Sequence, residues 1–151
     1  MEITITKHYV MFEKHTDLEI RLQQWRDVRN NSSSEQAVLE SFANIKVLAR
    51  YLDYYTPESW YNPFDIVENG FFCTTGISVL LYHTLESLGY IDTELVEWKV
   101  ISNHITGYDG AVFVYDDHMY NLSPGKKVHI SKVGDMCIEL RRLGHIKLLN
   151  I

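Results

Sequence analysis

The chain has few of the residues that cross-link small folds. Among its 151 residues there are only two cysteines, Cys73 and Cys137, which lie far apart in the sequence. Two cysteines are too few for a disulfide framework or for a zinc site built from thiolates. The seven histidines are scattered without the spacing that metal ligands show. We therefore expect no metal and no cofactor.

Proline, glycine and long apolar runs are also scarce. Three prolines and eight glycines leave no low-complexity linker, and a chain of this length is long enough to bury one sizeable core. No run approaches the length of a membrane span, and no secretory leader opens the sequence. These absences predict a single domain over residues 1–151, located in the cytoplasm and without membrane contact.

Positively charged side chains are fewer than negatively charged ones. The 14 lysines and arginines are outnumbered by 20 aspartates and glutamates, which gives a net charge of −6. Domains that bind nucleic acid usually carry a basic stripe, so we expect no nucleic-acid partner. Hydrophobic residues, in contrast, make up 46% of the chain and aromatic residues 13%. This composition is typical of a globular protein.

One cysteine stands where the most strongly periodic segment begins. Apolar residues recur at three- and four-residue intervals from Ile77 to Leu88, which predicts a helix with one buried face, and Gly89 would end it. Thr74 and Thr75 are suitable N-cap residues, so Cys73 would lie at or just before the first turn. The unpaired N–H groups and the helix dipole there favour a thiolate. Cys73 is therefore the candidate nucleophile, although a lone cysteine is more often a small buried hydrophobe.

The segments before Cys73 predict mainly helices. Residues 3–12 alternate between apolar and polar side chains, as in a strand. Residues 17–28 form an amphipathic pattern that is typical of a helix. A second helix is predicted over residues 35–52, after a capping box formed by Ser32 and Glu35.

The segments after the Cys73 helix predict mainly strands. Residues 116–118, Asp-Asp-His, are typical of a hairpin turn. The predicted strands, rich in β-branched and aromatic residues, are 93–101, 111–115, 119–122, 128–133 and 145–151, with a two-turn helix over 136–143. Together the patterns predict an α+β domain. In it, N-terminal helices and a central helix that carries Cys73 at its start pack on a small antiparallel sheet.

An aromatic loop lies just before the Cys73 helix. Trp60, Tyr61 and Phe64 fall between Pro57 and the predicted helix start, with Pro63 among them. Such a cluster either covers the core or forms a surface for a partner. If it forms a surface, we expect a protein or peptide to bind there.

The segment from Phe64 to Pro124 resembles the core of transglutaminase-like domains, which are relatives of the papain-like cysteine peptidases. The matching features are Gly70-Phe71-Phe72-Cys73, a helix ending in Leu88-Gly89-Tyr90, a strand over Leu95 to Val100, the sequence Phe113-Val114-Tyr115, and Leu122-Ser123-Pro124 where the family has aspartate-proline. The resemblance leaves the first sixty residues unaccounted for. It implies acyl transfer or amide hydrolysis by a cysteine, histidine and aspartate triad.

The resemblance also implies that the triad is degenerate. It places Asp109 where the family histidine stands, while His104 lies five residues earlier, and it places Ser123 where the aspartate stands. Asn121 lies nearby, and an asparagine can orient the histidine in the papain branch. In an active form, Cys73 would attack an acyl carbon, His104 would be the base, and Asn121 or Ser123 would orient its ring. In an inactive form, the fold persists without a base and the aromatic loop binds a protein or peptide.

A more remote alternative comes from two short motifs. His104-Ile105-Thr106 and His129-Ile130-Ser131 resemble the paired motifs of the two-histidine phosphoesterases. Residues i and i+2 of a strand share a face, so each motif could present an imidazole and a hydroxyl to one phosphate. The copies are only 25 residues apart, whereas that family separates them by a whole lobe. Coincidence is therefore the favoured explanation.

Overall fold

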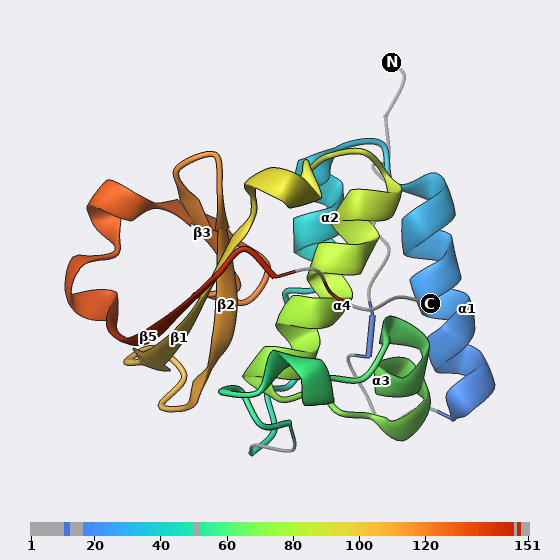
Figure 1. Ribbon diagram of the computed structural model, residues 1–151. Coiled ribbons are helices and arrows are strands. Elements are labelled where there is room, and N and C mark those ends of the chain that lie inside the picture. Colours follow the sequence, from blue (N-terminus) through green and yellow to red (C-terminus); the bar gives the residue numbers. More distant parts are fainter. Residues whose placement is uncertain (1–10, 13–16, 50–51, 147, 149–151) are drawn as a thin grey trace.

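The computed structural model describes residues 11–12, 17–49, 52–146 and 148. A group of helices packs against one face of a five-stranded antiparallel sheet (Figure 1). The predicted α+β class, with helices first and strands afterwards, is therefore confirmed. The strand predicted over residues 3–12 falls almost wholly outside the described residues, as does part of the strand predicted over 145–151.

The helices are α1 (Leu18–Asn31), α2 (Glu35–Ser41), α3 (Pro63–Asn69) and α4 (Thr74–Ser87). Each begins at a side chain that accepts a hydrogen bond from a first-turn N–H group; these caps are Asp17, Ser34, Asn62 and Cys73. The helix predicted over 17–28 is thus confirmed. The second predicted helix starts two residues later than the capping box implied, because its cap is Ser34 rather than Ser32.

The second predicted helix is also much shorter than expected. It ends at Ser41, although apolar residues continue at helical spacing to Leu52. The N–H groups of Phe42 and Ala43 bond to carbonyls three residues back, which tightens and ends the last turn. Leu48 then donates its N–H to the carbonyl of Phe72. The segment therefore leaves the helix to contact the chain just before Cys73, a tertiary contact that local periodicity does not encode.

The sheet has the order β4-β3-β2-β1-β5, with every neighbouring pair antiparallel. Its strands are β1 (Glu97–Asn103), β2 (Asp109–Tyr115), β3 (His118–Tyr120), β4 (Lys127–His129) and β5 (Cys137–Gly144). The predicted hairpin between β2 and β3 is confirmed. Asp116 and Asp117 form its turn with positive φ angles of 50° and 58°, as the right-handed twist of a two-residue hairpin requires.

Strand β5 corrects one prediction. Residues 136–143 were expected to form a short helix, but residues 137–144 pair with β1 at the edge of the sheet. Most side chains of β5 are exposed, including Ile138 and Leu140. The order of apolar and polar residues in β5 therefore does not distinguish a strand from a helix, and pairing with β1 decides its conformation. The pairing is interrupted by two register shifts.

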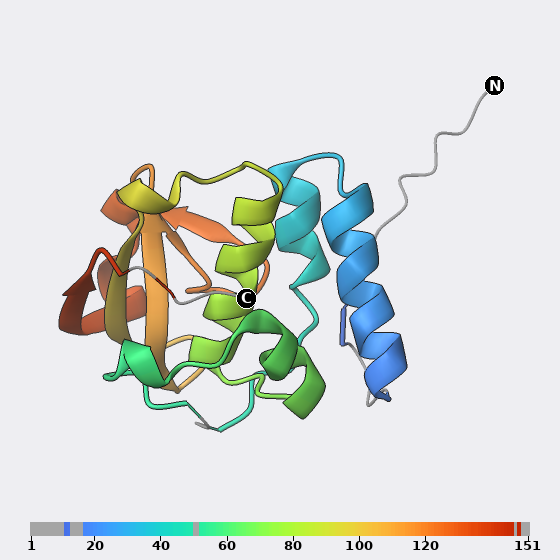
Figure 2. The same cartoon turned by 45° about the vertical axis from the view of Figure 1, so that its right-hand side comes forward.

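Helix α4 is the centre of the molecule. It lies between the sheet on one side and α1, α2 and α3 on the other (Figure 2). Every residue from Thr74 to Leu85 is buried, so the helix is enclosed on all sides rather than along the single predicted face. The other face of the sheet holds a small second cluster, Ile101, Val112, Met119 and Leu122. No helix among the described residues is long and apolar enough to cross a membrane.

Candidate functional site

Cys73 is the N-cap residue of α4. Its Sγ accepts a hydrogen bond from the N–H group of Gly76 at 3.4 Å, and the residue is 3% exposed. The turn into the helix is tight, because a Cβ atom on Gly76 would lie 1.9 Å from the carbonyl oxygen of Phe71. Only glycine fits at this position. The sulfur therefore occupies the place at the positive end of the helix that the sequence predicted.

The first turn of α4 is fixed to the sheet by buried hydrogen bonds. The hydroxyl of Thr75 accepts the N–H of Ala111 in β2 at 3.0 Å. The side-chain nitrogen of Asn121 donates to the carbonyl of Thr74 at 3.1 Å and to the hydroxyl of Ser78 at 2.8 Å. These bonds join elements far apart in the sequence. The cysteine consequently sits on a rigid junction between helix and sheet rather than on a loop.

A small cleft of about 230 Å³ adjoins this junction. Its lining residues are Leu48, Tyr54, Cys73, Thr74, Thr75, Gly107, Tyr108 and Asp109. Asp109 opens β2, and the strand passes so close to α4 that a Cβ on Gly110 would lie 2.6 Å from the Cβ of Thr74. The structure therefore brings together Cys73 and Asp109, the residue that the family resemblance aligns with a histidine.

His104 is not among the residues that line this cleft. Its Nδ1 lies 2.8 Å from the carbonyl oxygen of Asp135, and its backbone N–H bonds to the carbonyl of Met136. A carbonyl is only an acceptor, so Nδ1 carries the proton. Both bonds attach His104 to the turn that precedes β5. In this arrangement the predicted base bonds to other groups and is not part of the cleft lining.

The two candidates for the third triad position are also separated from an imidazole. The amide nitrogen of Asn121 bonds to α4, and its backbone has a φ of 68°. Ser123 is half-buried, and its carbonyl accepts the N–H of Lys126 in a turn. Neither side chain has a histidine partner among the described residues. Asn121 is instead a positioning residue for the start of α4.

The aromatic loop is divided between two neighbourhoods. The ring of Trp60 packs against Trp98 of β1, with centroids 5.1 Å apart. Tyr61 is 46% exposed. Phe64, in contrast, meets the edge of Trp25 in α1 at 4.9 Å. Trp60 and Tyr61 therefore belong to one surface, and Phe64 contacts the outer helices.

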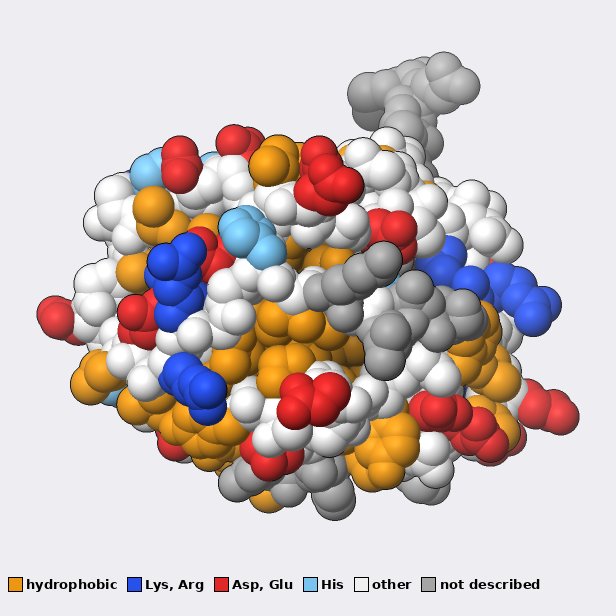
Figure 3. Space-filling view, in the orientation of Figure 1, with side chains coloured by type: hydrophobic (Ala, Val, Ile, Leu, Met, Phe, Trp, Pro, Cys, Tyr) orange, Lys and Arg blue, Asp and Glu red, His pale blue; other side chains and the backbone are white. Residues whose placement is uncertain are grey.

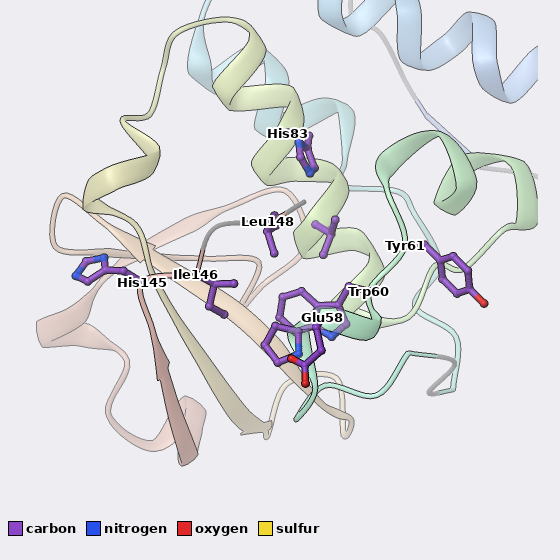
Figure 4. A pocket seen from close by; sticks show the side chains of 9 residues that line it. Glu58, Trp60, Tyr61, His83, His145, Ile146 and Leu148 are labelled. Carbon is purple, nitrogen blue, oxygen red and sulfur yellow. The ribbon is translucent and has the colours of Figure 1, made fainter. Parts of the chain in front are cut away.

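Trp60 and Tyr61 line a larger cavity of about 440 Å³ (Figure 4). The residues around it are Pro57, Glu58, Trp60, Tyr61, Val79, His83, His145, Ile146 and Leu148. Sequence reasoning missed this cavity, because one wall comes from His145, Ile146 and Leu148, which were assigned to a terminal strand. The helical spacing of Val79 and His83 was the available signal, since residues four apart share a helix face.

Burial has a marked effect on His83. The side chain is 8% exposed, and desolvation lowers its pKa from 6.5 to about 4. Its ring meets that of Tyr82 edge-on at 5.3 Å. At neutral pH the imidazole is therefore uncharged, and it faces the cavity as a neutral group that can donate or accept a hydrogen bond.

The two histidine motifs lie apart. His129 ends β4, and its Nδ1 bonds to the hydroxyl of Ser131 at 2.8 Å. His104 follows β1, and β3 and β2 lie between β4 and β1 in the sheet. The arrangement does not place both motifs, His104 with Thr106 and His129 with Ser131, around one phosphate.

Comparison with known proteins identifies the fold. No protein-family model matches the chain, and no curated protein sequence matches it. A solved structure, Legionella pneumophila LapG in a calcium-bound form, is similar, with a TM-score of 0.63 and 10% sequence identity. The similarity covers 86% of this chain and 77% of LapG. At this identity the likeness concerns the fold alone.

The calcium named with that structure is a property of LapG. The described residues contain no group of three or more histidine, cysteine, aspartate or glutamate side chains that could hold a metal ion. Calcium requires six to eight oxygen ligands. The similarity to LapG thus supports the overall fold that the sequence predicts, with Cys73 at the start of its central helix.

Proposed function

We propose that this chain is a catalytically degenerate member of the transglutaminase-like fold, and that it acts by binding a protein or peptide rather than by amide chemistry. The observation that carries the proposal is the lining of the Cys73 cleft. It contains the carboxylate of Asp109 and no imidazole. The fold supplies the position for a nucleophile, while the group that would activate it is absent from the cleft.

Catalysis by a cysteine needs a base as well as a thiol. The base must lie within hydrogen-bond reach of the sulfur, and a third group must fix its orientation. It must also return its proton to the leaving amine, a task for which imidazole is suited near neutral pH. A carboxylate such as that of Asp109 is a much weaker base than an imidazole. The cleft is therefore poorly suited both to activating the thiol and to protonating the leaving amine.

Binding is supported by the larger cavity. Trp60 and the half-exposed Tyr61 border the 440 Å³ cavity beside α4, and aromatic side chains of this kind are enriched at binding surfaces. The proposed partner contacts these two residues. Phe64 contributes indirectly, because its contact with Trp25 fixes the start of α3 against α1.

Alkylation of Cys73 tests the loss of catalysis. The measurement is the rate of iodoacetamide labelling in a Cys137→Ser variant, folded and in concentrated urea at the same pH. We expect slower labelling in the folded state, because the thiol is 3% exposed and lacks an activating imidazole. Labelling that is faster in the folded protein than in urea would show an activated thiolate and refute the proposal.

The active form makes a different prediction for the same assay. The Gly76 N–H group that donates to Sγ would stabilise a thiolate, and His104 would have to leave Asp135 to reach the sulfur. Substitution of His104 by alanine would then lower the labelling rate of Cys73. Our proposal expects the rate to stay unchanged, since the ring of His104 bonds elsewhere.

A further inference from the structure

The larger cavity has the size of a small-ligand site. Its volume of about 440 Å³ falls within the range of pockets that enclose small molecules. It lies between α4, the loop that carries Trp60, and the chain segment after β5. Hydrophobic side chains gather in a hollow in the middle of this face (Figure 3).

The inner walls of the cavity are apolar. Val79 of α4 belongs to the lining. Ile146 and Leu148 come from the C-terminal segment, and the Trp60 ring lies opposite them (Figure 4). The Trp60 indole is held by its contact with Trp98 and by a hydrogen bond from Nε1 to the carbonyl of Asp53. A fixed indole beside aliphatic side chains suits an aromatic or aliphatic group.

Several polar groups around these walls can accept a hydrogen bond. Nδ1 of His145 lies 2.7 Å from the carbonyl of Val96 and is engaged by it. Glu58 adds an exposed carboxylate at the rim. His83 faces the cavity from α4 (Figure 4). No lysine or arginine belongs to the lining.

We infer that this cavity binds a ligand that joins an apolar group to an ammonium group, with the apolar part against Trp60 and Val79 and the ammonium against Glu58. An ammonium has three donors and no acceptor, which complements the acceptors of this lining. It also gains from the carboxylate and from the Trp60 ring face. The inference rests on the proposed binding function, because Trp60 belongs both to the proposed partner-binding surface and to this cavity.

Three probes with the same phenyl group test the charge preference. They are 2-phenylethylamine, 2-phenylethanol and 3-phenylpropionate, and their dissociation constants are measured by NMR titration of the labelled full chain. We expect the amine to bind about tenfold more tightly than the alcohol, because a charge-assisted hydrogen bond replaces a neutral one. The carboxylate should bind most weakly, since it meets Glu58 and finds no cation in the lining.

Substitution at the rim provides the matched control. In Glu58→Gln the amine should lose its advantage over the alcohol, while the affinity for the alcohol stays unchanged. Glu94→Gln removes the same charge from an exposed residue outside the lining and should leave all three constants unchanged. Both positions are exposed, so neither substitution threatens the fold.

A free amine and the N-terminal amine of a peptide present the same chemistry. A tripeptide amide with N-terminal phenylalanine, and its N-acetylated form, distinguish them. Tighter binding of the free peptide than of 2-phenylethylamine supports a peptide end as the source, and weaker binding supports a small amine.

Two results would overturn the inference. One is equal affinity for amine and alcohol in the wild type, and the other is an amine preference that persists in Glu58→Gln. Either result leaves the labelling rate of Cys73 untouched, so failure here is distinguishable from failure of the proposed loss of catalysis.

Discussion

Acid should destabilise the protein through His83. Its pKa is about 4 in the folded state and 6.5 when exposed, so the unfolded chain takes up a proton at a pH where the folded chain does not. Stability from this residue is complete above pH 6.5 and is lost as the pH falls towards 4, below which both states are protonated. The two pKa values give a loss of about 2 kcal/mol in the free energy of unfolding at pH 5.

Urea denaturation at pH 7 and pH 5 measures this effect. The seven histidines and the carboxylates all contribute to pH dependence, so the quantity of interest is the difference between wild type and His83→Leu. We expect the wild type to lose about 2 kcal/mol more than His83→Leu between these pH values. A control variant, His129→Gln, changes an exposed histidine and should behave as the wild type. Equal losses in wild type and His83→Leu would refute the burial argument.

Three substitutions test the contacts that hold the site and the sheet, each by urea or thermal denaturation. Gly110→Ala should lower the free energy of unfolding by roughly 1–3 kcal/mol, because its Cβ would lie 2.6 Å from that of Thr74. An unchanged free energy of unfolding would show that β2 can move away from α4. Thr75→Val keeps the shape but leaves the buried N–H of Ala111 without its acceptor, at a cost of about 1–3 kcal/mol, whereas Thr75→Ser should retain most of the stability. Asp117→Gly should raise the melting temperature by a few degrees, since glycine adopts the φ of 58° without strain, and a lower value would contradict this reading of the turn.

The parts of the fold that the sequence predicts well are those with local determinants. The start of α4 follows from the periodic apolar segment, although its N-cap is Cys73 rather than Thr74 or Thr75, and the hairpin follows from Asp116 and Asp117. Local patterns failed where pairing decides the conformation. Strand β5 has mostly exposed side chains and becomes a strand only because it pairs with β1. Helix α2 ends early because the following chain contacts Phe72.

In the candidate site, too, features with local determinants could be predicted and features set by long-range contacts could not. The position of Cys73 could be predicted, since helix caps depend on neighbouring residues. The position of His104 could not, because it depends on the carbonyl of Asp135, 31 residues further along the chain. The cavity beside His83 depends on where His145, Ile146 and Leu148 lie, far from α4 in the sequence. The sequence shows which chemical groups are present, and long-range packing decides which of them meet.

The central claim is that the cleft keeps the thiol and lacks the base. The most direct measurement is the iodoacetamide labelling rate of Cys73 at pH 7 in three proteins that carry Cys137→Ser: the parent, Asp109→His and Asp109→Asn. An ordinary thiol is only a few per cent ionised at this pH, so an imidazole in the cleft should accelerate labelling on the order of tenfold. We predict that only Asp109→His shows this gain, with Asp109→Asn close to the parent. A parent protein that already labels as fast as Asp109→His would contradict the account, because some other group would then be activating Cys73.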